Sequence, residues 1–274
     1  MSSILTNNSA MVALATLKDV NRGLNETQNR VSSGLQVSSG KDNAAYFAIS
    51  ETMKGDSGMF KAINEGMTAT KNSVATARLG AETVSDLAQQ MVERIAFAQS
   101  DGIDKAAVQS ELDAMAENMQ SAIDQATFNG DDLVGGAAAA VTVVTGISRA
   151  GGTFATTTMS FNSVDLQAIQ TALAAVDLTT STDVAADLVT AEGELQNAIT
   201  AATSLGVTEN TIEGQMQFVE SLTDTIDSGV SSMVDADMEE EAARLQAYQV
   251  QQQLATQSLS IANRAPQNIL SLFR

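Results

Sequence analysis

Apolar residues recur at alternating spacings of three and four along both ends of the chain and along two long stretches between them. This spacing places side chains on one face of an α-helix. The first stripe predicts a helix over residues 1–36, which Met11, Leu14 and Leu35 broaden and Gly34 begins to break. Its members are Ala10, Ala13, Leu17, Val20, Leu24, Thr27 and Val31.

The longest regular stripe covers residues 60–98 and predicts a helix of roughly 60 Å at 1.5 Å per residue. Its members are Phe60, Ile63, Met67, Thr70, Val74, Ala77, Ala81, Val84, Ala88, Met91, Ile95 and Ala98. Gly102 follows its end. Before it, residues 40–50 predict a turn and a short apolar segment, and Gly55 and Gly58 mark a further weak point.

A shorter helix is predicted next, and the pattern then changes to that of strands. The helical stripe consists of Val108, Leu112, Met115, Met119, Ala122 and Ala126, and a turn at 128–131 stops it. Residues 141–145 and 153–161 are β-branched and bounded by turn residues, so they predict a β-hairpin with 146–152 as its connection. Residues 166–176 predict a short helix.

The helical stripe returns over residues 184–233. Its members are Val184, Leu188, Ala191, Leu195, Ala198, Ala202, Leu205, Ile212, Met216, Val219, Ile226, Val230 and Met233. Glu209 and Thr223 are its polar interruptions, and Gly206, Gly214 and Gly229 are weak points.

The last segment, residues 234–274, begins acidic and continues as an amphipathic run. One stripe consists of Met238, Ala242, Leu245, Tyr248, Ala255, Leu259 and Ala262, with Gln252 as its polar interruption, and a second consists of Val250, Leu254, Ile261 and Ala265. A helix with two apolar faces needs more than one neighbour to cover it, and a free terminus usually frays. We therefore predict that this segment is buried by something outside its own fold.

The order of these elements is nearly palindromic, and such a chain folds most simply as a hairpin with its two ends side by side. We predict a mainly α fold, an antiparallel long-helix bundle or coiled coil with a small β-hairpin insert and the termini paired as a helical hairpin. The predicted domains are residues 1–45, a helical rod at 46–234 with the hairpin near 141–161, and residues 235–274, which pair with 1–45.

Composition and charge restrict the chemistry. The absence of Cys and His removes thiolate nucleophiles, imidazole bases and ordinary zinc sites. A net charge of −19, from 14 basic and 33 acidic residues, opposes binding to nucleic acid and anionic membranes. No apolar stretch reaches about 18 residues, and the N-terminus lacks a secretory signal pattern. We predict no enzyme activity, no cofactor or metal site and no membrane insertion.

Three local patterns have an ordinary structural interpretation. The acidic run Glu239, Glu240 and Glu241 fits a solvated face or a salt-bridge surface between subunits better than a cation site. The glycine pair at 151–152 fits a hairpin turn rather than a phosphate loop. The aspartate pair at 131–132 lacks the remaining ligands of an EF-hand.

Short motifs near the two ends resemble those of a known family. Arg-Val-Ser-Ser-Gly-Leu at 30–35 with Asp-Asn-Ala-Ala at 42–45 resembles the N-terminal pattern of the bacterial flagellins. Phe-Asn-Gly at 128–130 matches a turn of that family, and Val-Asp-Ala-Asp-Met at 234–238 and the run 258–274 resemble its C-terminal signature. The runs SILTNNSAM and DNAAYFAI are most similar to short flagellins of alphaproteobacteria.

The resemblance implies a structural subunit that polymerises into the helical flagellar filament for swimming motility. In the family, the terminal helices order on assembly and line the inner tube, so residues 1–45 and 235–274 are expected to be filament-core helices. The implied partners are further copies of the chain, other flagellins, the flagellar cap, hook–filament junction proteins, an export chaperone and the type III export apparatus. Export by this route does not require a signal peptide, and it implies a secreted, extracellular location in the bacterial flagellum.

Two features depart from the large members of the family. The insert between Gly130 and Val184 is short, so no large outer domains are expected. The family's Q-R-V-R-E-L, which a host Toll-like receptor reads, is Q-M-V-E-R-I at 90–95. Met91 replaces an arginine there and the charge order is changed, which argues against recognition by that receptor.

The residues predicted to carry self-assembly are Leu14, Leu17, Leu24, Val31, Leu35, Leu245, Leu254, Leu259, Ile261, Leu272, Phe273 and Arg274. A hook–filament junction protein, which shares similar terminal helices, is the alternative function, and the motifs at 28–49 and 258–274 favour the filament. An enzyme on the same scaffold would need a cluster of polar groups, and the sequence offers none.

Overall fold

The computed structural model describes residues 7–149 and 153–272, with side chains of the last helix described as far as residue 264. Its contacts divide the chain into two compact units. Unit 1 combines the two ends of the chain, Met1–Ser57 and Thr225–Arg274, and unit 2 is Gly58–Asp224. The three-domain division predicted from the sequence has other bounds and stays a prediction.

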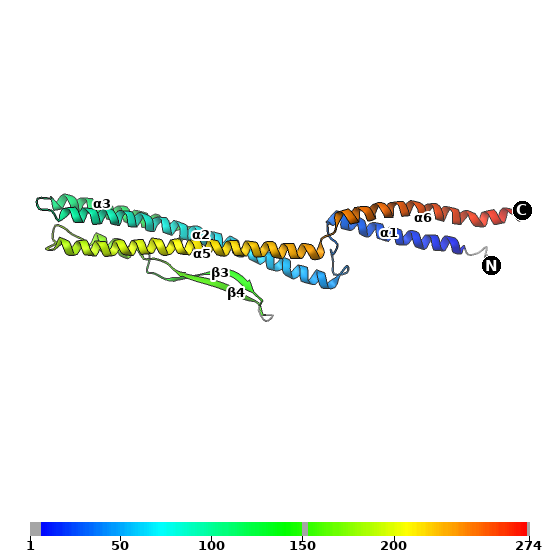
Figure 1. Cartoon of the computed structure of the whole chain (residues 1–274), viewed down its shortest axis with the longest axis horizontal. Coiled ribbons are helices and arrows are strands. Elements are labelled where there is room, and N and C mark those ends of the chain that lie inside the picture. Colours follow the sequence, from blue (N-terminus) through cyan, green and yellow to red (C-terminus); the bar gives the residue numbers. More distant parts are fainter. Residues whose placement is uncertain (1–6, 150–152, 273–274) are drawn as a thin grey trace. The chain divides into compact units, whose positions relative to one another are not determined.

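The described residues form six helices and two small antiparallel sheets. Figure 1 shows the long helices and the larger of the two sheets along the chain. The helices are α1 (Asn8–Ser33), α2 (Ala44–Ala98), α3 (Lys105–Gln125), α4 (Leu166–Ala174), α5 (Val184–Val234) and α6 (Met238–Leu272). The strands are β1 (Thr127–Phe128), β2 (Asp131–Asp132), β3 (Ala140–Ser148) and β4 (Ala155–Asn162). The predicted mainly α fold with a β-hairpin insert is confirmed.

The stripes predicted on α2 and α5 supply the core of unit 2. The buried stripe residues there are Phe60, Met67, Val74, Ala77, Ala81, Val84, Ala88, Met91, Ile95 and Ala98 on α2, and Ala191, Ala198, Leu205, Ile212 and Val219 on α5. Their many alanines let helices approach closely. Arg78 pairs with Glu209 at 2.8 Å and Lys71 pairs with Glu213 at 3.3 Å, so the two helices run antiparallel.

The start of α2 differs from the prediction. The sequence predicts this helix only from residue 60, whereas α2 begins at Ala44 and includes both Gly55 and Gly58. A glycine inside a helix costs about 1 kcal/mol relative to alanine. Contacts with α5 within unit 1 offset part of this cost, and one of them is a hydrogen bond of 2.6 Å from Ser57 to Asp227. Tertiary packing thus extends the helix through Gly55 and Gly58, two residues with low helix propensity.

The buried face of α3 is shifted by one residue from the prediction at two places. Met115 and Ala122 belong to the predicted stripe, but Ala116 and Ile123 are the buried residues. An α-helix has 3.6 residues per turn and drifts away from a strict seven-residue repeat. In addition, α4 covers this face, and Gln170 donates a hydrogen bond to the carbonyl of Ala116 at 3.3 Å.

The predicted hairpin is formed by β3 and β4 and is confirmed. One residue, Thr145, has no partner across the ladder and makes a bulge. The hairpin is attached to α5 of the same unit, because Gln215 Nε2 donates to the carbonyl of Thr145 at 3.3 Å. Strand β3 continues to Ser148, so the connection is shorter than predicted. Gly151 and Gly152 lie outside the described residues.

The predicted Phe-Asn-Gly turn joins β1 to β2. Asn129 has a φ of 52° and Gly130 a φ of 87°. Two successive positive φ values are the requirement of a type I′ hairpin turn, which Asn-Gly satisfies better than any other common pair. Asp132 of β2 forms the next turn of the chain, because its Oδ1 accepts hydrogen bonds from the backbone N–H groups of Val134 and Gly135.

A close contact in unit 2 gives a test of its packing. A Cβ added at Gly80 would lie 2.5 Å from the Cβ of Ala126, whereas a Cβ at Gly66, in the same helix, would meet nothing within 4 Å. We expect Gly66→Ala to stabilise unit 2 by up to about 1 kcal/mol, the helix propensity gain. Gly80→Ala should destabilise it by about 1–2 kcal/mol, since overpacking outweighs that gain. Urea unfolding followed by circular dichroism measures both, and equal stabilities would contradict the contact.

Candidate functional site

The two terminal helices, α1 and α6, lie side by side in unit 1 (Figure 1). Polar contacts between their described residues cross the pair: Asn7 Nδ2, at the N-cap of α1, donates to the carbonyl of Ala262 at 2.8 Å, Gln252 Nε2 donates to Asn21 Oδ1 at 2.7 Å, and Arg30 pairs with Glu241 at 3.3 Å. Rising numbers on α1 meet falling numbers on α6. The predicted helical hairpin of the termini is therefore antiparallel.

The seam between α1 and α6 contains the predicted stripe of α1 and, from Leu245 onward, the first predicted stripe of α6. Every stripe residue of α1 is buried or half-buried, and Val20 and Thr27 are the most enclosed. Ala255 is the buried stripe residue of α6. The helices come closest where the ring of Tyr248 lies against the backbone of Gly23, since a Cβ there would be 2.5 Å from the ring. Pairing thus uses one face of each helix.

One buried carboxylate corrects the sequence interpretation at the start of α6. Met238 and Ala242 belong to the predicted stripe but are exposed, and Glu241 is only 4% exposed. Its Oε1 accepts hydrogen bonds from Arg30 Nη1 at 3.3 Å and from Arg244 Nη1 at 3.2 Å. The prediction of a solvated acidic face is wrong for this residue, because two guanidinium groups compensate its burial.

The remaining acidic residues of this run agree with the prediction. Glu239 and Glu240 are exposed, and Glu240 pairs with Arg244 one turn later at 2.6 Å. The sequence signal for the buried ion pair was present in Arg30, which opens the Arg-Val-Ser-Ser-Gly-Leu motif. Residues so distant in sequence cannot be paired from spacing alone.

The second apolar stripe of α6 faces away from the seam. Val250 is 55% exposed, Leu254 is 58% exposed and Ile261 is 71% exposed. On α1, Met11 and Val12 are likewise more than half exposed. Unit 1 therefore carries apolar side chains on its outer faces that no other described residue covers. Together these residues form what we call the outer face of the terminal pair.

The structure divides the twelve predicted self-assembly residues into four groups. Leu17, Leu24, Val31, Leu245 and Leu259 are half-buried. Leu14, Leu254 and Ile261 are exposed, and Leu35 lies in the loop after α1. The side chain of Leu272 is not described, and Phe273 and Arg274 lie outside the described residues. The sequence did not separate the first group, which joins the two helices of one chain, from the second, which remains available.

The loop after α1 and the link between α5 and α6 are hydrogen-bonded to each other. Gly34 ends α1 with a φ of 73°, a left-handed conformation that glycine adopts without strain. Its carbonyl accepts from the N–H of Ala236 at 2.9 Å, and the N–H groups of Gln36 and Val37 donate to the carbonyl of Val234 at 2.7 and 3.2 Å. The motifs at 30–35 and 234–238 thus form one joint, which we call the terminal joint.

The Asp-Asn-Ala-Ala motif builds the start of α2. Asp42 Oδ2 accepts four hydrogen bonds from the hydroxyl and N–H groups of Ser38 and Ser39, and Asn43 Oδ1 caps the helix through the N–H groups of Ala45 and the next residue. The hydroxyls of Ser39 and Ser38 lower the pKa of Asp42 from its usual 3.8. The contribution of this turn to stability is present above that pH and is lost as pH falls through the lower folded pKa.

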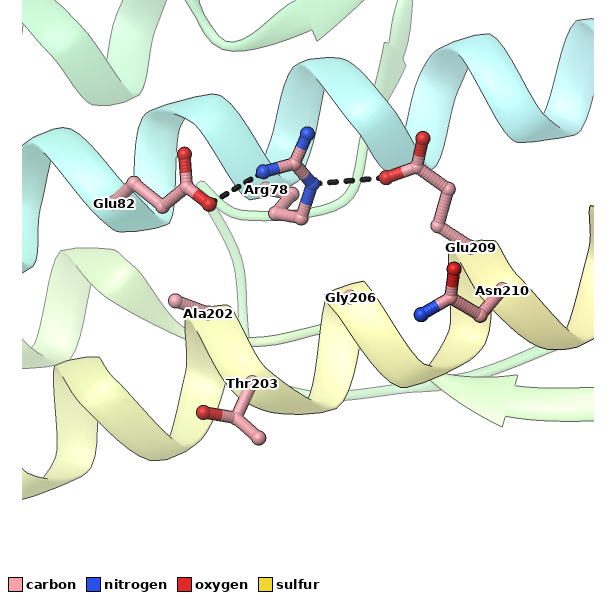
Figure 2. A pocket seen from close by; sticks show the side chains of 7 residues that line it. All are labelled: Arg78, Glu82, Ala202, Thr203, Gly206, Glu209 and Asn210. Atoms are coloured by element: carbon pink, nitrogen blue, oxygen red, sulfur yellow. Dashed lines mark hydrogen bonds and ion pairs between the residues drawn. The ribbon is translucent and has the colours of Figure 1, made fainter.

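A second candidate site is a surface cleft of about 460 Å³ in unit 2, shown in Figure 2. Arg78 reaches between Glu82 of its own helix and Glu209 of α5, and its Nε lies 2.8 Å from the Glu209 carboxylate. Hydrogen bonds to Glu209 and Glu82 raise the pKa of Arg78. Ala202, Thr203, Gly206 and Asn210 complete the lining. The arginine is already compensated by two carboxylates, so the cleft holds helices together and offers no free cation to a ligand.

Searches for other chemistry among the described residues give two further findings. No group of three or more acidic side chains within them is arranged to hold a metal ion. Of the helices described, none combines the length and the apolar character needed to cross a membrane.

The chain is similar to bacterial flagellins at both ends and over its full length. Residues 4–139 match a family model for the bacterial flagellin N-terminal helical region, and residues 188–273 match one for the C-terminal helical region. The chain is 37% identical to a flagellin of Brucella melitensis and 33% identical to flagellin C of Rhizobium meliloti, with both chains of each pair fully covered. It is 31% identical to a flagellin of Caulobacter vibrioides, over 100% of this chain and 99% of that protein.

One solved structure has a similar fold at low sequence identity. It is a protein from Vibrio parahaemolyticus described as flagellar hook-associated, with a TM-score of 0.52 and 11% identity. The match covers 71% of this chain and 100% of that chain. At this identity the likeness concerns the fold alone.

The buried ion pair gives a test of the α1–α6 seam. We expect Glu241→Gln to weaken the pairing by about 1–3 kcal/mol, since Arg30 loses its anionic acceptor and a buried charge-assisted bond becomes neutral. Glu239→Gln removes the same charge two residues earlier, at an exposed position, and should change stability by less than about 1 kcal/mol. Hydrogen exchange of the α1 and α6 amides measures both. Similar exchange in the two variants would show that the pair does not hold the seam.

Proposed function

The chain belongs to the bacterial flagellin family, whose members are the structural subunits of the extracellular flagellar filament, and we propose that its terminal pair, α1 with α6, is the element that drives polymerisation. The chain itself is a filament subunit that associates with further copies and with flagellar components. We assign the polymerisation contacts to particular faces of unit 1.

The observation that carries the proposal is the exposure of the outer face. Ile261, Leu254 and Val250 stand in solvent on a helix whose other face is already paired. Burying one such side chain is worth about 1.5–3 kcal/mol. A monomer cannot gain this energy, because nothing else described in unit 1 reaches that face. Neighbouring copies of the chain supply the missing cover.

The free energy of burying these side chains explains why, in this proposal, ordering of the terminal helices is coupled to assembly. Fixing the backbone costs about 1–2 kcal/mol per residue, and the α1–α6 seam is narrow, with small or polar residues such as Ala255, Thr27 and Gln252. Contacts on the outer face add the stabilisation that the seam alone lacks. Segments of this kind order on binding and lose the order when released.

An open polymer requires that the contacts between copies be head-to-tail. If one patch of a subunit met the same patch of another, a closed dimer would result. Within the outer face, the exposed residues of α1 and those of α6 lie on two different helices, so each set can meet a different neighbour. We therefore assign residues 1–45 and 235–274 to the filament core, and residues 46–234 to the layer around it.

We extend the proposal to the partners that the family implies. They are the flagellar cap, hook–filament junction proteins, an export chaperone and the type III export apparatus, together with other flagellins. Support comes from the terminal motifs, which this chain shares with the family. We also propose that the chain has no catalytic activity. Met91 is fully buried in α2 and differs from the family's arginine, which supports the proposal that the Toll-like receptor does not recognise this chain.

A hook–filament junction protein remains the alternative, favoured by the fold shared with the hook-associated protein of Vibrio parahaemolyticus. The filament role is better supported, because full-length relatives of the chain are flagellins, one of them 37% identical. Electron microscopy of purified protein after seeding distinguishes them: long helical filaments support the filament subunit, and short caps or junctions on pre-existing filaments support the alternative.

The proposal predicts that a charge on the outer face blocks assembly. We expect Ile261→Asp to raise the critical concentration for seeded polymerisation by at least about tenfold, since a carboxylate would be buried without a partner. The export and helicity of the monomer should stay unchanged, because this position faces away from the seam. Ser260→Asp adds the same charge one residue earlier at an exposed polar position and should polymerise nearly as the parent chain does. Normal filaments from Ile261→Asp would exclude this face from the assembly contacts.

A further inference from the structure

The turn between β1 and β2 contains the one asparagine of the chain that a glycine follows. Asn129 precedes Gly130, whereas every other asparagine precedes a residue with a side chain. Both residues of the pair are exposed. A side chain on the following residue hinders attack of its backbone nitrogen on the asparagine amide, and glycine removes that hindrance. Asn129 is therefore the asparagine of this chain that is most open to such an attack.

The reaction that this pair permits is deamidation, which makes asparagine a thermolabile residue and needs no reactant besides water. The backbone nitrogen of Gly130 loses its proton and attacks Cγ of Asn129, so that a new C–N bond closes a cyclic imide. The bond from Cγ to the side-chain nitrogen breaks, and that nitrogen leaves as ammonia with the proton. Water then opens the imide at either carbonyl carbon. One opening gives aspartate, and the other gives isoaspartate, in which the main chain runs through Cγ.

The conformation of the closed turn opposes this reaction. The φ values of Asn129 and Gly130, 52° and 87°, are those of a type I′ turn, in which the ψ of the first central residue is about +30°. At that ψ the nitrogen of Gly130 points away from the Asn129 side chain, whereas ring closure requires it to eclipse Cβ. The Cα–C bond of Asn129 must therefore rotate before the imide can form, and this rotation opens the turn.

A short ladder closes this turn, and the chain that follows it is anchored. The ladder pairs the two residues of β1 with the two of β2. Beyond it, the carbonyl of Leu133 accepts a hydrogen bond from the N–H of Val164 at 3.0 Å, and the carbonyl of Val134 accepts one from the N–H of Leu166 at 2.9 Å. A two-stranded hairpin has little stability of its own. Its tip can therefore open locally while the rest of unit 2 stays folded.

We propose that Asn129 is a site at which the chain deamidates itself, and that the β1–β2 turn controls the reaction. The closed turn holds the Gly130 nitrogen away from the amide, and each opening permits attack. Isoaspartate adds one carbon to the main chain, which a two-residue type I′ loop cannot accommodate, so the hairpin does not close again. The new carboxylate also lies close to Asp131, and like charges repel. The reaction belongs to unit 2 and is independent of the polymerisation contacts proposed above.

The test ages the full chain at mildly alkaline pH, folded in buffer and unfolded in urea, and follows amide-to-acid conversion by peptide mass spectrometry. We expect Asn129 to convert at least about tenfold faster in urea, because the folded chain reacts only through the opened turn. Asn162 is the internal control: it is exposed, but Ser163 follows it, so it should convert much more slowly than Asn129 in urea. Gly130→Ala should slow Asn129 in urea to the rate of Asn162. A purified isoaspartyl methyltransferase identifies the isoaspartate product.

A second variant separates the new charge from the altered main chain. Asp-Gly also favours a type I′ turn, so Asn129→Asp places a carboxylate on an intact main chain. Hydrogen exchange of the β1 and β2 amides should be nearly unchanged in this variant and at least about tenfold faster in aged chain that contains isoaspartate.

The possible results separate clearly. Fast conversion of Asn129 in urea with slow conversion in the folded chain supports the proposal. A rate in urea no higher than that of Asn162 would overturn the assignment of the site, and equal rates in buffer and urea would overturn control by the turn. Equally fast exchange in Asn129→Asp would show that charge, and not isoaspartate, keeps the hairpin open.

Discussion

Each long helix of this chain can bury only a narrow stripe, and its stability depends on a partner that runs alongside it for a comparable length. In unit 2 that stripe is rich in alanine, from Ala77 to Ala98 on α2 and at Ala191 and Ala198 on α5. Small side chains bring helices close but bury little area each. The stabilisation is therefore distributed over many residues along each helix. The terminal helices α1 and α6 bury only one face each, so their exposed apolar side chains need a further partner.

Four of the fourteen basic residues join one helix to another. Arg30 joins α1 to α6, Lys71 and Arg78 join α2 to α5, and Arg94 joins α2 to α3 through Glu111 at 3.1 Å. Exposed ion pairs contribute little energy. In a chain with a charge of −19, however, they remove repulsion at the contacts between helices. Glu241 is the one such carboxylate that is almost fully buried, and it takes two arginines to compensate it.

The motifs shared with the flagellin family have mainly structural roles within unit 1. Arg30 reaches the buried carboxylate, Gly34 permits the left-handed end of α1, and Asp42 closes the turn before α2. Asp237 caps α6 through two N–H groups. These residues fix how the terminal helices leave the joint. The apolar residues on the outer faces, by contrast, have no motif that identifies them, because any large apolar side chain can cover a neighbour.

The sequence alone determined the helical stripes, the hairpin, the turn at Asn129 and the pairing of the two ends, because helical and strand periodicity are local properties that a single chain displays. Tertiary structure decided three things. Contacts such as the hydrogen bond from Ser57 to Asp227 keep α2 helical at Gly55 and Gly58. At the start of α6 the buried side chain of the seam is Glu241 rather than the predicted Ala242. The structure also separated seam residues such as Leu259 from outer residues such as Ile261. Each of these depends on a partner more than a hundred residues away, and the spacing of residues within one segment carries no information about which partner that is.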